Sequence, residues 1–208
     1  MTVIVVEPAQ ALLDASALRR LVPGLDGLDD DHLNMLIVVA QQSIEPPLGW
    51  ARRAFGRQTL ELVMQGFGGA RAVIDLPHPP LKSIVSITFE QAPGAAVILP
   101  EAAYLVFSDG LFGAVRPAVG AAWPSGCGIA RIRYVAGYET TDPSLLPAKQ
   151  AVALSVQALR VFAREDLFLK REKTDGVGEK EWAVSPSAER MMRDAADRLL
   201  QPYRIPRV

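Results

Sequence analysis

The side chains that could carry catalysis are few in this sequence of 208 residues and lie far apart. It contains two histidines and one cysteine. His32 follows three aspartates at an expected helix start and His78 stands between prolines, so neither has a predicted base or nucleophile beside it. Cys127 lies between glycines in SGCGIA, where nothing in the sequence indicates the activating environment that a reactive thiol needs. Surface or structural roles are therefore predicted for all three residues.

The carboxylates and glycine clusters also have ordinary explanations. Acidic residues 29–31 open a predicted helix, where they favour the helix dipole and the free amides, so no metal site is predicted there. The pairs Glu179 with Glu181 and Asp194 with Asp197 lie in a charged stretch and on the last predicted helix, where solvated charge is expected. GFGG, GCG and GVG are not followed by the GK[ST] of a phosphate-binding loop. The sequence predicts no catalytic residue, no cofactor, no metal and no enzymatic activity.

Composition and charge restrict the remaining classes. Half of the residues are hydrophobic, and 22 basic residues nearly balance 23 acidic ones, so a general attraction for nucleic acid is not expected. A single cysteine excludes an intramolecular disulfide and favours a reducing compartment. The start MTVIVVEPAQ lacks the basic region of a signal peptide, and the apolar stretch 148–163 is interrupted by charged and amide side chains. We expect a soluble protein with no membrane partner.

Helical periodicity predicts helices at both ends of the chain. Asp14 can cap a short helix, and a second helix begins near Asp29 and is stopped by Pro46 and Pro47. The longest helix follows Leu145 and is apolar enough to be covered on most sides. After the charged stretch KREKTDGVGEKEW, which indicates an exposed hinge or arm, SAERMMRDAADRLL forms the last helix.

The central region alternates with the period of two that strands require. Strands are expected over 57–64, 72–76, 84–89, 104–107, 111–115 and 129–135, separated by glycine, proline and aspartate turn signals. Trp123 and Tyr138 flank the last strand and are expected to close the core of this antiparallel region. The run IDLPHPPLKSIVSITF places Pro77, Pro79 and Pro80 between two strands. Proline fixes φ and removes an amide donor from a sheet, so this run predicts a rigid elbow.

The C-terminus combines a narrow apolar stripe with aromatic and basic residues. Met191, Leu199 and Leu200 belong to this stripe, between charged residues of the last helix. Tyr203 lies beside Arg204 in the tail LQPYRIPRV. Because a flexible tail has no core to join, and because tyrosine and arginine are common interface anchors, a partner is expected here.

Six segments occur in an order that is typical of a known family. They are SIEPPLGWARRAFGRQTLEL, IDLPHPPLKSIVSITF, AAYLVF, VRPAVGAAWP, IRYVAGYETTDPSLLPAKQAVAL and LLQPYR. Together they cover most of the chain from Ile44 to Arg204, and the chain thereby resembles the head–tail connector proteins, or adaptors, of long-tailed bacteriophages and phage-derived gene transfer agents. The segment PPLGWARRAFGR departs from the family pattern, which has a Thr-Gly-Arg-like segment at this place.

The resemblance implies an α+β fold built on a helical core, residues 1–56 and 137–173, made of the N-terminal helices plus the long helix. An antiparallel β-region, residues 57–136, is inserted into this core. Residues 174–208 form a hinge and a C-terminal helical arm that binds the portal. The implied portal-interface candidates are Met191, Leu199, Leu200, Tyr203, Arg204 and Ile205.

The implied function is that of a structural virion protein. A homo-oligomeric ring of about twelve copies docks on the portal at the DNA-packaging vertex and joins it to the stopper or next neck protein. DNA passes through the lumen with transient, non-specific contact. The protein resides in the virion neck after assembly in the cytoplasm of the bacterial host. Replacing Pro77, Pro79 and Pro80 with alanine is then expected to impair ring formation more than secondary structure.

Two alternatives stay open. The chain could be a stopper or tail-completion protein of the same neck, which has no direct contact with the portal. It could also be a small-molecule-binding enzyme or accessory domain with a pocket around Trp123, Cys127 and Tyr138, which predicts a stable monomer or dimer and loss of function on single substitutions at those residues.

Overall fold

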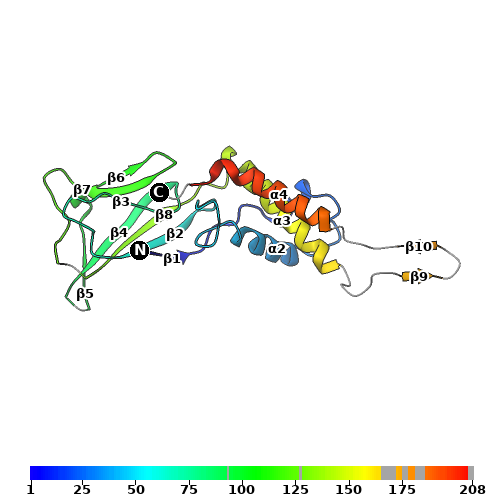
Figure 1. Ribbon diagram of the computed structural model, residues 1–208, viewed down its shortest axis with the longest axis horizontal. Coiled ribbons are helices and arrows are strands. Elements are labelled where there is room, and N and C mark those ends of the chain that lie inside the picture. Colours follow the sequence, from blue (N-terminus) through cyan, green and yellow to red (C-terminus); the bar gives the residue numbers. More distant parts are fainter. Residues whose placement is uncertain (93, 127, 165–171, 175–177, 181–185, 206–208) are drawn as a thin grey trace. The chain divides into compact units, whose positions relative to one another are not determined.

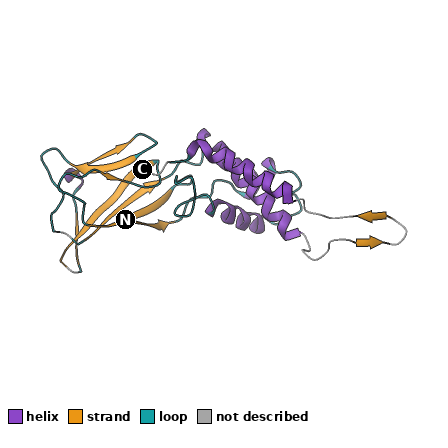
Figure 2. Cartoon of the chain, in the orientation of Figure 1, coloured by secondary structure: helices purple, strands orange, loops and turns teal. Residues whose placement is uncertain are grey.

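The computed structural model describes residues 1–92, 94–126, 128–164, 172–174, 178–180 and 186–205. The fold is α+β, as predicted, with α-helices and antiparallel sheets (Figures 1 and 2). The chain forms two compact units. The β-unit comprises residues 1–12, 42–145 and the tail from residue 203, and the helical unit comprises residues 13–41 and 146–202.

This division differs from the one expected from the sequence. Residues 1–12 and 42–56, predicted to belong to a helical core, lie in the β-unit. The last helix, predicted to form an arm, belongs to the helical unit. The reason is pairing and packing: the N-terminal segment adds an edge strand to the larger sheet, and the last helix packs along the longest one.

The larger sheet has five antiparallel strands in the order β1-β2-β8-β4-β5. The strands are β1 (Thr2–Glu7), β2 (Gln58–Gln65), β8 (Ile129–Ala136), β4 (Leu81–Ala92) and β5 (Ala95–Ile98). Ile132 lies opposite Leu62 on one side and Ile87 on the other, and all three are fully buried. Such cross-strand apolar contacts are the unit of sheet stabilisation, and they place the core of the β-unit on one face of this sheet.

A smaller sheet completes this core. Its strands are β3 (Ile74–Asp75), β7 (Gly113–Pro117) and β6 (Tyr104–Ser108), in the order β3-β7-β6. Val115 of β7 is fully buried in the same hydrophobic cluster as Leu62. The six predicted strands correspond to β2, β3, β4, β6, β7 and β8. β1 and β5 lie outside the prediction, because TVIVVE and AAVI are short apolar runs without the alternation of apolar and polar residues on which the strand predictions rest.

The helical unit contains α1 (Ala15–Leu21), α2 (Asp30–Gln42), α3 (Leu146–Arg164), α4 (Pro186–Leu200) and the antiparallel pair β9 (Glu172–Thr174) and β10 (Gly178–Lys180). Short 3-10 helices cover Glu101–Ala103, Pro143–Leu145 and Gln201–Tyr203. Asp14 caps α1 as predicted: its carboxylate accepts a hydrogen bond from the Ala17 amide at 2.7 Å, which lowers the pKa of Asp14. The carboxylate of Asp29 accepts hydrogen bonds from the amides of Asp31 and His32 at the start of α2.

The buried face of α3 consists of small residues. Ala148, Ala151, Val152, Ala153 and Val156 are fully buried. α4 packs along α3 and ends at Leu200, which is also buried. Small side chains on α3 permit the close approach of α4. Close packing of buried side chains is therefore the main stabilising contact of the helical unit. No helix in the described part of the chain is long and apolar enough to cross a membrane.

Candidate functional site

The described residues contain no cluster of side chains that could bind a metal ion. Nowhere among them do three or more histidine, cysteine, aspartate and glutamate side chains come together as a metal site would require. His32 is exposed near the start of α2, while Cys127 and Glu181 lie outside the described residues.

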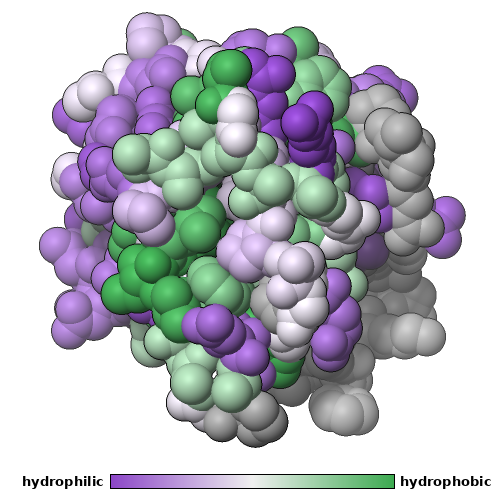
Figure 3. Space-filling view, turned by 90° about the vertical axis from the view of Figure 1, so that its left-hand side faces the viewer, coloured by the Kyte–Doolittle hydropathy of each residue, from purple (hydrophilic) through white to green (hydrophobic). Residues whose placement is uncertain are grey.

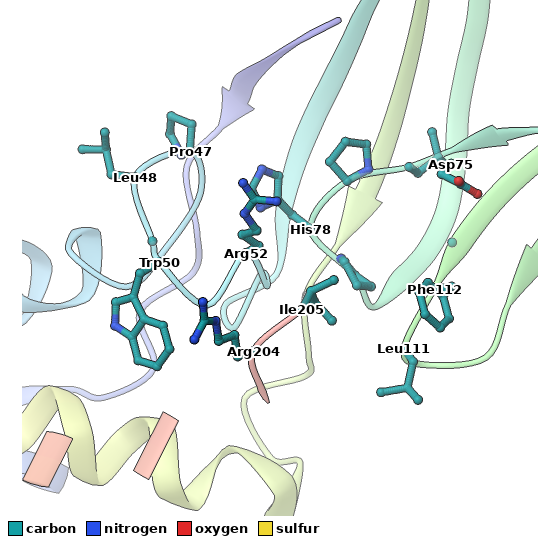
Figure 4. Close-up of a pocket in the computed structure, with 15 residues that line it drawn as sticks. Pro47, Leu48, Trp50, Arg52, Asp75, His78, Leu111, Phe112, Arg204 and Ile205 are labelled. Atoms are coloured by element: carbon teal, nitrogen blue, oxygen red, sulfur yellow. The ribbon is translucent and has the colours of Figure 1, made fainter. Parts of the chain in front are cut away.

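The β-unit contains an open groove of ≈ 860 Å³ at the proline elbow (Figure 4). It is lined by residues of four segments: the loop 47–52, the elbow 75–79, the turn 111–113 and the tail residues 204–205. We call it the elbow groove. Each of its four walls is fixed by hydrogen bonds or by close packing within the β-unit.

The loop wall depends on a buried carboxylate. Glu45 accepts hydrogen bonds from the amides of Phe55 and Gly56 at 3.0 and 2.6 Å. Hydrogen bonds to a charged acceptor are stronger than neutral ones, so they fix the end of this loop. At Gly49 a Cβ atom would lie 2.0 Å from a backbone carbonyl oxygen, so the path of the loop requires glycine there.

The elbow wall is fixed through its carbonyl groups, since proline has no amide hydrogen to donate. Three carbonyls accept hydrogen bonds: that of Pro77 from the Tyr134 hydroxyl at 2.7 Å, that of Pro79 from the Ala54 amide at 3.1 Å, and that of Pro80 from the Gly137 amide at 3.0 Å. Burial raises the pKa of Tyr134, so its hydroxyl stays a donor at any physiological pH. All three partners belong to the β-unit, so these contacts fix the wall of the groove.

The turn wall presents two large apolar side chains. The carboxylate of Asp109 accepts hydrogen bonds from the amides of Phe112 and Leu111 at 2.7 and 2.9 Å, and these bonds lower the pKa of Asp109. A Cβ atom on Gly113 would lie 2.6 Å from the Cβ of Leu81, so the turn sits directly against β4. The backbone is thus fixed while the side chains of Leu111 and Phe112 remain exposed.

The tail wall is held by the buried side chain of Arg53. Its Nε donates to the carbonyl of Tyr203 at 3.0 Å, and its Nη1 donates to the carbonyl of Gly110 at 3.0 Å and to the hydroxyl of Tyr138 at 2.6 Å. The hydroxyl of Tyr203 donates to the carbonyl of Ser144. The expectation that Tyr203 lies in a tail with no core to join is therefore wrong. Its bonds attach the tail to the β-unit and place the next two residues in the groove.

The elbow groove combines positive charge with large apolar side chains. In the part of the chain that the structure describes, neither Arg52 nor Arg204 has a carboxylate within ion-pair distance. Trp50 and Phe112 are exposed in the same lining, and Asp75 is its one acidic residue. Arginine and aromatic side chains are enriched at the centres of protein interfaces, so this lining is suited to a protein partner that carries negative charge.

His78 has a structural place in the elbow wall. Its backbone φ is 60°, a left-handed conformation that few residues other than glycine adopt. Burial lowers the pKa of His78 and the charge of Arg52 lowers it further, against the opposite effect of a hydrogen bond with the Arg52 backbone. The buried Nδ1 atom has no hydrogen-bond partner among the described residues. The imidazole is therefore neutral at pH 7.

The residues predicted to meet the portal occupy three different environments. Met191 is 70% exposed on α4, whereas Leu199 is half-buried and Leu200 is a core residue that is only 1% exposed. Arg204 and Ile205 line the elbow groove. The structure does not bring these residues together on one surface of α4, because the last turn of the helix packs inward.

Trp123 and Tyr138 belong to different sets of contacts. Trp123 stacks on Phe67, with ring centroids 4.7 Å apart, and its Nε1 donates to the carbonyl of Ala72 at 2.7 Å. Tyr138 accepts its hydrogen bond from Arg53. A cavity of ≈ 310 Å³ beside Trp123 is lined by four glycines and four other small or apolar residues, and none of its described lining residues has an ionisable side chain. Of the other two residues of the predicted pocket, Tyr138 is not in this lining and Cys127 lies outside the described residues.

Trp50, Arg52 and Phe112 are not among the residues predicted from the sequence. Two of them lie in PPLGWARRAFGR, the segment that departs from the family pattern and that here forms the loop wall. A tryptophan and two arginines in a proline-flanked loop were a usable signal, because both residue types anchor interfaces. Phe112 joins them only through folding, and no sequence spacing indicates this.

Hydrophobic side chains are also exposed away from the groove. Ile98 and Val119 of the β-unit are among them. On the face drawn in Figure 3, hydrophobic residues gather around the centre and polar residues lie along one side. More than one surface of the chain is therefore suited to contact with another protein.

No protein-family model and no curated protein sequence matches the chain. Solved structures do match it in fold, among them three from gene transfer agent particles. A chain from the neck of an empty gene transfer agent particle, computed with C6 symmetry, and a chain from the virion of the native particle each give a TM-score of 0.67. A chain from the neck of the native particle, computed with C12 symmetry, gives a TM-score of 0.62.

These matches extend over the whole fold. In each, the identity is 20%, and the match covers 100% of this chain and 97% of the other. Both compact units are thus included. The chain has the fold of a chain found in the necks and virions of gene transfer agent particles.

Proposed function

We propose that this protein is a structural component of the virion neck, a head–tail adaptor that forms a ring of about twelve copies around the DNA channel. The ring docks on the portal and joins it to the next neck protein, after assembly in the host cytoplasm. The observation that carries this proposal is the full-length likeness in fold to a chain from gene transfer agent necks, one of them computed with C12 symmetry.

The distribution of functional groups supports a structural role. Asp14, Asp109 and Asp142, whose pKa values are lowered, cap a helix or close turns, and Tyr134, whose pKa is raised, lies in the core of the β-unit. The prominent surface feature is instead a pre-formed groove with exposed aromatic and arginine side chains. Rigid walls reduce the entropy that a partner's binding would cost.

The near-zero net charge suits a ring through which DNA must move. A net charge of −1 leaves no general positive surface that would retain the duplex. Because phosphate contacts dominate the affinity for DNA, a strongly basic lining would oppose passage. Contact between the ring and DNA is therefore transient and independent of sequence.

For the portal contact we retain α4 and specifically Met191. Its side chain is exposed on a helix whose opposite side packs on α3. Leu200 and Tyr203 are not proposed as direct anchors, since Leu200 is buried and the hydroxyl of Tyr203 donates to the carbonyl of Ser144 inside the β-unit. A modest contact at each copy suffices, because about twelve copies bound to one portal act together through avidity.

The test is the mass of the assembly, measured by light scattering coupled to size exclusion, for the purified chain with and without the portal of its particle. The full chain should join the portal in one fixed multiple. Met191→Asp should weaken this association by about tenfold or more, because a desolvated charge is costly in an interface. Val85→Asp is the matched control, since Val85 is similarly exposed but lies on β4.

A substitution is preferable to deleting the arm. Truncation before α4 removes Leu200 and the Tyr203 contacts of Arg53, so the remaining chain would lose part of both cores. If the intact chain never joins the portal but joins the next neck protein, the protein is a stopper or tail-completion protein. If it joins neither and remains a monomer or dimer, the neck assignment is wrong.

A further inference from the structure

The outer face of α2 carries an apolar stripe that no described residue covers. Met35, Val38 and Val39 are 62%, 48% and 54% exposed, and their spacing of three and four residues puts them on one face of the helix. The buried residues Leu33 and Ile37 mark the other face. A helix of the helical unit thus presents hydrophobic residues on both faces, which is typical of an interaction surface.

The same stripe begins with negative charge. Asp31 precedes Met35 by four residues, so both lie on the same side of α2. Asp31 is exposed and has no ion pair among the described residues, whereas Asp30 pairs with Arg19 at 2.5 Å. Asp26, also exposed, lies just upstream. On this face of α2 the carboxylate of Asp31 therefore precedes the apolar side chains.

The elbow groove has the complementary chemistry. It offers the guanidinium groups of Arg52 and Arg204, both without carboxylate partners in the described chain, and the exposed rings of Trp50 and Phe112 (Figure 4). Recognition of one face of an amphipathic helix by an apolar groove is a recurrent binding mode. Opposite charges at the margin of such a contact fix its direction and register.

We propose that the outer face of α2 of one copy occupies the elbow groove of the neighbouring copy and that this contact closes the ring. Met35 and Val38 pack against Trp50 and Phe112, and Asp31 lies near the guanidinium groups. This inference rests on the proposed function, because it assigns the contact between copies of that ring.

Ring symmetry is the reason to choose a second copy as the occupant. A ring needs a heterologous contact, in which two different surfaces of the same chain meet. The groove and the α2 stripe are two different surfaces, made of different residues in different compact units. The net charge of −1 provides no general attraction between copies, so local complementarity of this kind must supply it.

Disulfide cross-linking tests the contact directly. Met35→Cys and Phe112→Cys are combined in a chain in which Cys127 is replaced by serine, and the protein is oxidised both alone at high concentration and bound to the portal. A disulfide forms only when the two Cα atoms come within about 7 Å. We expect a ladder of covalent oligomers of this chain. The control pairs Met35→Cys with Val119→Cys, since Val119 is 92% exposed and does not line the groove.

A charge exchange provides the second measurement. Arg52→Glu with Arg204→Glu should weaken ring formation by about tenfold or more. Adding Asp26→Arg and Asp31→Arg in the same chain should restore most of it, because the complementarity is re-established with the signs exchanged. A merely structural role of the arginines would not be rescued in this way.

The outcomes separate this inference from the proposed function. If the wild-type chain joins the portal but the cysteine pair gives no covalent oligomers in either sample, the α2 contact is wrong and the adaptor role stands. If Phe112→Cys forms a disulfide with a cysteine of the portal, the groove binds the portal and the inference is overturned. If covalent oligomers form in the protein alone while the portal is never bound, the contact stands and the adaptor role fails.

Discussion

The β-unit and the helical unit are stabilised by different kinds of contact. In the β-unit, buried polar side chains reach across the chain to fix loops: Arg53 holds the tail and a turn, and Glu45 holds the loop wall. In the helical unit, fully buried alanine and valine side chains of α3 set the packing. The shape of the elbow groove therefore depends on a few hydrogen bonds, whereas the packing of the helices depends on the volumes of the buried side chains.

The largest expected effect comes from removing the polar contacts of the β-unit. Arg53→Met keeps much of the volume but leaves the carbonyls of Tyr203 and Gly110 and the hydroxyl of Tyr138 without their donor. We expect the free energy of unfolding to fall by about 3 kcal/mol, since several partly buried groups lose charge-assisted hydrogen bonds together. Urea denaturation followed by tryptophan fluorescence measures it, with Trp182 replaced by phenylalanine so that Trp50 and Trp123 report on the β-unit.

A second arginine of the same unit is the control. Arg57 forms an exposed ion pair with Glu139 at 3.0 Å. Because solvent screens such a pair, Arg57→Met should cost less than about 1 kcal/mol. If both variants lost the same free energy of unfolding, Arg53 would stabilise the β-unit only as an ordinary surface charge does. The two units would then not differ in the kind of contact that stabilises them.

The helical unit should respond to volume instead. Ala153→Leu adds three carbon atoms at a fully buried position of α3. Overpacking of this kind is expected to lower the free energy of unfolding by about 2 kcal/mol. Denaturation followed by circular dichroism at the helical band measures the loss. Met191→Leu, at an exposed position of α4, should leave stability unchanged, and a tolerant response at Ala153 would mean that the packing of α3 is loose.

The same contrast explains what could be predicted from the sequence. The helix starts at Asp14 and Asp29 follow from capping chemistry, which is local, and the six central strands follow from alternation. The division into units was not predictable in this way. It depends on β1 pairing with β2, more than fifty residues later, and on α4 packing against α3, and neither partner is encoded in local periodicity.

The candidate site shows the limit more sharply. Proline spacing predicts the elbow, but the groove exists because Phe112, Trp50 and Arg204 come together from segments far apart in the chain. Tyr203 illustrates the opposite error. As a tail residue next to arginine it has the sequence of an interface anchor, yet Arg53 and Ser144 occupy its polar atoms inside the β-unit.

The smallest expected effect is a pH dependence confined to the β-unit. Protonation of His78 puts a hydrogen on both ring nitrogens, including the buried Nδ1, which has no acceptor among the described residues. Burial accordingly holds the pKa of His78 below its ordinary value of 6.5. Between the two values the unfolded chain binds more protons than the folded one, so the stability due to neutral His78 is complete above pH 6.5 and is lost as the pH falls toward the lowered value.

The measurement compares melting temperatures of the β-unit at about pH 7.5 and pH 5.5. His78→Asn is the test variant, because asparagine tolerates the left-handed backbone at φ 60° and does not titrate. In this variant the acid-induced decrease in the melting temperature should be smaller than in the wild-type chain by about 2 °C. His32→Asn, at the exposed start of α2, is the control and should leave the decrease unchanged. If the two variants behaved alike, the imidazole of His78 would have to be hydrated in solution, and the elbow wall would be less tightly closed than its hydrogen bonds indicate.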